Sequence, residues 1–145
     1  MRVAWGVVVV LLTGPTWVGQ VVNAVAPGPA ARFGLTEAEA DVEPLFWVDT
    51  RAEAAWDAWT LWVLPVAGVL MVADHDWWTY FGLVGGGSYL YFAGRGVVAR
   101  LRMRRDGFRI GSDRDVRVGI AALAVWGLVA AGTIAAAIGS LESVG

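Results

Sequence analysis

Apolar stretches alternate with polar, charged segments along this chain. The stretch between Arg2 and Arg32 contains no charged residue over 29 positions, and the stretch between Arg117 and Glu142 contains none over 24. A helix rises about 1.5 Å per residue, so about 20 apolar residues cross the roughly 30 Å hydrocarbon core of a bilayer. Each of these two stretches therefore predicts a transmembrane helix.

Two further uncharged runs lie in the middle of the chain, at 58–73 and 77–94, separated by Asp74-His75-Asp76. They are shorter, so their helices need flanking residues or snorkelling side chains to reach both interfaces. We therefore predict four transmembrane helices, at about 3–22, 55–73, 77–99 and 115–139. The polar loops between them are predicted at 23–54 and 100–114.

The composition supports lipid rather than water as the solvent. Hydrophobic residues make up 57% of the 145 positions, which is too much apolar material for one soluble core of this size. The predicted fold class is all-α, a single domain over 1–145 that forms a four-helix bundle in a membrane. Its basic residues are all arginine, and the abundance of Ala, Val and Gly suggests a GC-rich prokaryotic source.

The first polar loop contains turn signals and one short helical pattern. Pro27, Gly28 and Pro29 predict a linker. Thr36 followed by acidic residues predicts an N-cap and a short interfacial helix over 37–43, which Pro44 ends or bends. The next helix is then expected to start near Arg51, capped by the residues before it.

The arginines predict the orientation. The segments 23–57 and 95–117 hold ten of the eleven arginines, and arginine in short loops stays in the cytoplasm. Both segments are therefore predicted inside, with Met1, His75 and Gly145 outside. The alternative is that the first helix is a cleaved signal peptide with Arg2 in its n-region and cleavage after Ala26. Pro27 directly after that site and the orientation both disfavour it.

Catalytic motifs are absent from the sequence. There is no cysteine and only one histidine, and no nucleophile elbow, HExxH zinc motif, phosphate loop or dinucleotide fingerprint. We therefore assign no catalytic, cofactor-binding or metal-binding residue, expect no nucleic-acid partner, and find no support for an enzyme.

Four residues remain as functional candidates: Asp57, Asp74, His75 and Asp76. Asp57 lies one residue outside an uncharged run, where a carboxylate either pairs at the interface or serves a ligand or proton. A histidine between two aspartates suits pH sensing or a metal, but the simpler interpretation makes Asp76 the N-cap of the third helix and leaves His75 in solvent.

Small residues and arginines form two further groups. Small residues let helices approach closely, and they recur at intervals of four as Gly82 and Gly86, and as Gly127, Ala131, Ala135 and Gly139. Juxtamembrane arginines determine orientation and contact anionic lipid headgroups; this group comprises Arg100, Arg102, Arg104 and Arg105.

Three functions fit this pattern. The leading hypothesis is a structural or interaction protein that packs with itself or with a larger membrane partner. The alternative is a small transporter or a pH or ion sensor with a cavity near Pro65 and Gly85–Gly87. The second alternative is an enzyme acting on lipids, which requires Glu37, Asp41, Asp49 and Asp57 to converge in one lipid-accessible pocket.

Overall fold

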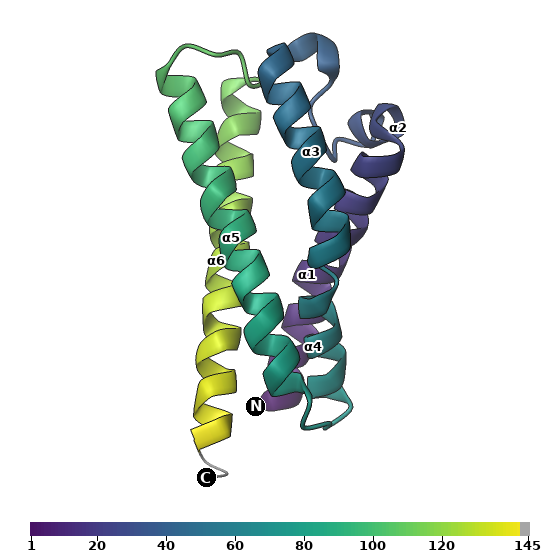
Figure 1. The fold of residues 1–145 in the computed structure, drawn as a ribbon, viewed down its shortest axis with the longest axis vertical. Helices are drawn as coiled ribbons and strands as arrows, with labels where there is room; N and C mark the ends of the chain where they lie inside the picture. The colour runs from purple at the N-terminus through teal and green to yellow at the C-terminus, as the bar shows by residue number, and fades with distance from the viewer. Residues whose placement is uncertain (143–145) are drawn as a thin grey trace.

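The structure is a computed structural model that describes residues 1–142, and within that range it contains helices and no β-strand. The all-α prediction is confirmed. The predicted outside position of Gly145 lies beyond the described residues. The elements are α1 (Arg2–Val25), α2 (Pro27–Arg32), the 3₁₀ turn η1 (Glu39–Asp41), α3 (Pro44–Thr60), α4 (Val63–Val72), α5 (Trp78–Arg105) and α6 (Asp113–Glu142) (Figure 1).

Three helices of the described chain are long and apolar enough to cross a membrane: α1, the Pro44–Val72 helix formed by α3 and α4, and α6. By length and composition, these helices suggest a membrane protein. The α5 helix is long, but its sequence is rich in glycine and aromatic residues and ends in arginines, so it is less apolar than the other three.

The long helices form two pairs that diverge along the molecule. One pair is α1 with the α3–α4 helix, the other is α5 with α6, and α4 joins them by packing against α5. Figure 1 shows the pairs close together at the end that contains the chain's N-terminus and apart at the end that contains the connecting loops.

Glycines allow close helix contacts at the narrow end, both between the two pairs and within one of them. Between the pairs, a Cβ added to Gly85 of α5 would lie 2.5 Å from the backbone nitrogen of Leu64 in α4. Within the first pair, a Cβ added to Gly6 of α1 would lie 2.8 Å from the carbonyl oxygen of Gly68 in α4. Real Cβ atoms do not approach this closely, so these contacts require glycine. Pro65 and Gly85 therefore lie in tight helix packing, and neither cavity described below includes them.

The second predicted helix begins earlier than expected and is interrupted. It was predicted at 55–73, whereas α3 starts at Pro44 and α4 follows after a break at Leu61 and Trp62. Proline is tolerated in the first turn of a helix, which explains the start at Pro44 rather than an end there. Pro65 has no N–H for the carbonyl of Leu61, four residues earlier, which explains the break.

The first loop also differs from its prediction. The linker contains the helix α2, with Pro27 in its first turn, and α1 runs on to Val25. In place of a helix over 37–43 there is only the turn η1, because Val42 leaves it in extended conformation and bridges to Ile110 of the other loop. The Glu43 N–H donates to the Arg109 carbonyl at 2.7 Å in the same contact.

The last two helices extend beyond the transmembrane segments predicted at 77–99 and 115–139. The third helix continues to Arg105, where Gly107 adopts a φ of +81° and turns the chain, so the predicted loop 100–114 shortens at both ends. The fourth helix begins at Asp113, next to a cap formed by Ser112 and Asp115. The Asp115 N–H donates to the Ser112 hydroxyl at 3.2 Å, and that hydroxyl donates to the Asp115 carboxylate at 2.5 Å.

Candidate functional site

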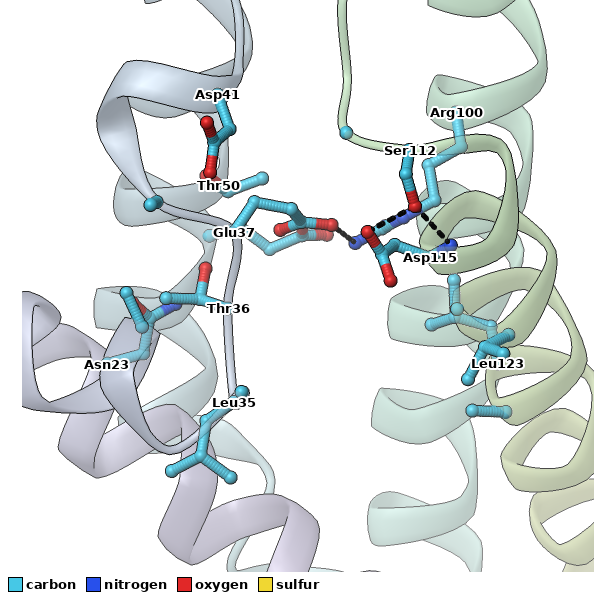
Figure 2. Close-up of a pocket in the computed structure, with 18 of the residues that line it drawn as sticks. Asn23, Leu35, Thr36, Glu37, Asp41, Thr50, Arg100, Ser112, Asp115 and Leu123 are labelled. Carbon is cyan, nitrogen blue, oxygen red and sulfur yellow. Dashed lines mark hydrogen bonds and ion pairs between the residues drawn. The ribbon is translucent and has the colours of Figure 1, made fainter.

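The wide end of the molecule contains a cleft of about 800 Å³ between the two helix pairs (Figure 2). Residues of α1 and of the segment after α2 form one side, and residues of α5 and α6 form the other. The polar residues of the lining are Gln20, Asn23, Thr36, Glu37, Asp41, Thr50, Glu53, Arg100, Arg109, Ser112 and Asp115.

A small hydrophobic cluster closes this end of the molecule beyond the cleft. Val42 and Phe46 from the first loop and α3 pack with Ile110 and Val116 from the second loop and α6, and all four are buried. Because the two loops also share the bridge between Val42 and Ile110, they are joined to each other. The cleft therefore lies below a connected pair of loops.

An arginine and two acids hold α3 and α5 together beside the cleft. Arg95 lies 2.5 Å from the Asp49 carboxylate and 2.6 Å from the Glu53 carboxylate, and the Glu53 side chain is only 13% exposed. The two acids are four residues apart, so they lie on one face of α3. Arg95 therefore bridges two turns of the facing helix.

Glu37 and Arg100 face each other across the cleft, 3.9 Å apart at their charged atoms (Figure 2). The Arg100 guanidinium also lies over the Phe46 ring, 5.7 Å from its centre. Arg100 is thereby separated from Arg102, Arg104 and Arg105, which are exposed on the end of α5. Of the four arginines predicted to contact lipid headgroups, Arg100 is therefore the one directed into the protein.

The inner wall of the cleft combines an unpaired amide with aromatic rings. Asn23 is 6% exposed, and its side-chain oxygen has no hydrogen-bond partner in the described part of the chain. Phe92 and Trp126 pack with their ring centres 5.8 Å apart. The Trp126 indole donates to the Leu12 carbonyl of α1 at 3.0 Å, which fixes the orientation of this ring.

Asp57 lies one turn beyond Glu53 on α3 and outside the cleft lining. It is 3% exposed and belongs to none of the ion pairs seen among residues 1–142. Arg51, six residues earlier on α3, lies over the Trp47 ring, 5.6 Å from its centre. The acids of the lipid-enzyme hypothesis are therefore divided, because Glu37 and Asp41 line the cleft while Asp49 binds Arg95 and Asp57 is buried elsewhere.

The turn with His75 lies at the opposite end of the molecule. Arg2 forms an ion pair with Asp74 and lies 4.0 Å from Asp76, and the His75 ring nitrogen Nδ1 accepts from the Trp77 N–H at 3.3 Å. The expected N-cap by the Asp76 side chain is wrong, because the N-cap of α5 is Trp77 and no side chain caps the helix there. Within the described chain no three His, Cys, Asp or Glu residues are grouped to hold a metal ion.

The small residues divide between two faces. Gly82 and Gly86 face α6: added Cβ atoms would lie 3.3 Å from Thr133 and 2.6 Å from Ile134. On α6 itself, Ala131, Ala135 and Gly139 are exposed, and only Gly127, next to Ala93, approaches α5. The first group therefore packs inside the molecule, and most of the second faces its surroundings.

The cleft and its ion pairs were missed by sequence reasoning, although a signal was present. Asp49, Glu53 and Asp57 recur every four residues, and Arg95 is the first charge after an apolar run that faces them. Comparison with protein-family models, with curated proteins and with solved structures finds no match to this chain.

Proposed function

We propose that the chain is a four-span membrane protein with its two loop-containing segments in the cytoplasm. The α5 helix packs against both α4 and α6, which belong to candidate spans, and this placement supports α5 as a fourth span. Ten of the eleven arginines fall in the segments 23–57 and 95–117, which supports the cytoplasmic position of the wide end.

In this arrangement the cleft opens near the cytoplasmic interface, and we propose that it binds a small organic cation for sensing or transport. One observation carries the proposal: the cleft lining has four carboxylates, on Glu37, Asp41, Glu53 and Asp115, against two guanidinium groups, on Arg100 and Arg109. A cleft with excess negative charge and low-dielectric walls concentrates cations.

The aromatic wall and the buried amide suit the same ligand. An ammonium group is attracted to the face of an aromatic ring, most strongly to tryptophan, and Trp126 with Phe92 presents such rings next to the acids. Buried polar groups normally have a hydrogen-bond partner, so the free Asn23 oxygen is a ready acceptor for an ammonium N–H.

Thermal unfolding of the detergent-solubilised protein tests the proposal. Choline and putrescine are the cationic probes, and glycerol and acetate are the neutral and anionic ones. A ligand present at 100 times its Kd stabilises the folded state by about 2.7 kcal/mol, so at least one cation is expected to raise the Tm. Stabilisation by acetate alone, or by no probe, contradicts a cation site.

A pair of aspartate variants locates the effect. Asp41→Asn removes a carboxylate from the cleft lining and is expected to reduce the cation-dependent rise in Tm. Asp106→Asn, at an exposed position outside the cleft, is expected to retain it. Equal cation-dependent rises in Tm for the two variants would show that the cation binds outside the cleft.

A second candidate function is helix-mediated assembly with another copy or with a larger membrane protein. The observation that favours it is the exposed small-residue face of α6, formed by Ala131, Ala135 and Gly139. Small residues at lipid-facing positions allow the close helix contacts that drive association in membranes. A protein that stays monomeric in mild detergent and cross-links to no partner in native membranes would contradict this function.

A further inference from the structure

A second cavity lies between α1 and α6 at the narrow end of the molecule and has a volume of about 780 Å³. Its walls are mainly apolar, with Ala4, Trp5 and Val8 from α1 and Gly132 and Ala136 from α6. The two helices contact each other little, so the groove between them reaches in to Trp78 of α5. A groove of this volume is large enough for a small molecule.

One polar atom at this groove is unexplained by the protein itself. Trp78 is 4% exposed, and its indole N–H has no hydrogen-bond partner in the described part of the chain. The neighbouring Trp5 indole, in contrast, donates to the Thr133 hydroxyl at 3.1 Å. Buried donors are normally paired and hydrocarbon supplies no water, so the Trp78 N–H is available to an acceptor from another molecule.

The mouth of the groove contains the guanidinium group of Arg2. This group pairs with Asp74, lies 4.0 Å from Asp76 and remains one-third exposed. Arginine has five N–H donors, so these contacts leave some of them free for a further acceptor. The groove therefore offers guanidinium donors at its mouth, a buried indole N–H and apolar walls, which match the phosphate, ester and hydrocarbon of a phospholipid.

We propose that this groove binds one chain of a glycerophospholipid from the adjacent leaflet, with an ester carbonyl accepting from the Trp78 indole and the phosphate near Arg2. A transmembrane helix from a partner fits less well, because the carbonyls of a helix are already bonded within it and do not supply the missing acceptor. The site is separate from the charged cleft and does not depend on its ligand.

Native mass spectrometry tests this site on protein released from nanodiscs of dioleoyl phosphatidylcholine and phosphatidylglycerol. The unmodified chain is expected to retain one lipid. Trp78→Phe keeps the ring but removes the N–H, and the loss of one hydrogen bond is expected to lower lipid occupancy about fivefold. Trp77→Phe is the matched control, because Trp77 is exposed and outside the groove, and it is expected to retain the lipid.

A second variant tests the groove without changing the indole. Ala136→Leu fills the groove from an exposed position on α6 and is expected to displace the lipid. This variant tests lipid binding in the groove even if Trp78→Phe does not fold. Absence of lipid from the unmodified chain, equal lipid retention in all variants, or retention of a second protein copy in place of lipid would each overturn the proposal.

Discussion

Gly85 and Gly87 of α5 have different surroundings, so the same substitution is expected to change stability differently at the two positions. Gly85 lies against the backbone of Leu64, whereas an added Cβ on Gly87 meets nothing within 4 Å. Gly85→Ala therefore forces α4 and α5 apart and is expected to destabilise the protein by about 1–3 kcal/mol. Gly87→Ala is expected to be neutral or to stabilise by up to about 1 kcal/mol, because alanine is the better helix former.

Unfolding of the two variants by titration of SDS into mild detergent measures the difference. Both substitutions add one methyl group to the same helix two positions apart, so they change its intrinsic propensity alike. Any difference between them reports the contact with Leu64. Equal stabilities for Gly85→Ala and Gly87→Ala would show that α4 and α5 are not in close contact at this position.

The sequence predicted the general environment of individual side chains better than it predicted the residues that they contact. Trp5 lies near the start of the first apolar stretch, where tryptophan is typical of a membrane interface, yet its indole donates to Thr133 of α6. Arg95 and Arg100 belong to an arginine-rich segment that predicts orientation, yet both turn inward to acids of the first loop and α3. Partners were not predictable because they lie 40 or more positions away, where local periodicity carries no information.

At the scale of helices, α1 depends on its neighbours around Pro15. Proline has no backbone N–H, so Pro15 leaves the Leu11 carbonyl, four residues earlier, without its helical partner. The next two carbonyls of α1 accept side-chain donors from other helices: Leu12 from Trp126 of α6, and Thr13 from the Tyr89 hydroxyl of α5 at 2.7 Å. Neighbouring helices commonly supply bonds to such carbonyls in membranes, so α1 is joined to both members of the second pair.

Removal of the Tyr89 hydroxyl tests this connection. Tyr89→Phe keeps the buried ring and leaves the Thr13 carbonyl without its donor, so a loss of about 1 kcal/mol is expected. Tyr91→Phe is the control on the same helix, because Tyr91 is 63% exposed, and a change below about 0.5 kcal/mol is expected there. SDS unfolding measures both, and an unchanged Tyr89→Phe stability would mean that this bond contributes nothing.

Some helix ends depend on a few adjacent residues, and a sequence shows such ends directly. The cap at Ser112 and the turn at Gly107 are of this kind. Pro44 was interpreted as a helix end although it occupies the first turn of α3, since proline suits either place and the sequence alone does not choose. The turn η1 replaced a predicted helix because pairing between the two loops was not visible locally.

At the scale of the whole molecule, different contacts join the two helix pairs at its two ends. At the narrow end Gly85 of α5 lets α4 approach closely, while at the wide end Arg95 with its acids joins α3 and α5 and leaves the cleft beside them. The apolar stretches predicted the helices themselves. The divergence of the two pairs was not predictable, because it depends on which residue of the neighbouring helix each glycine contacts.

The arginine distribution gives the whole molecule a testable orientation. Since the chain has no cysteine, single substitutions provide unique labelling sites. Ala40→Cys in the first loop, His75→Cys in the turn and Asp106→Cys in the second loop all lie at exposed positions. Asp106 is preferred to Gly107, whose positive φ disfavours a side chain.

Labelling of intact cells with a membrane-impermeant maleimide measures this orientation. With four spans and cytoplasmic arginines, only His75→Cys is expected to react, and the other two are expected to react after the membrane is opened. Labelling at Asp106→Cys but not at His75→Cys in intact cells would show that the protein has the opposite orientation. If α5 does not cross the membrane, the turn and the second loop lie on the same side, so equal labelling at His75→Cys and Asp106→Cys would exclude the fourth span.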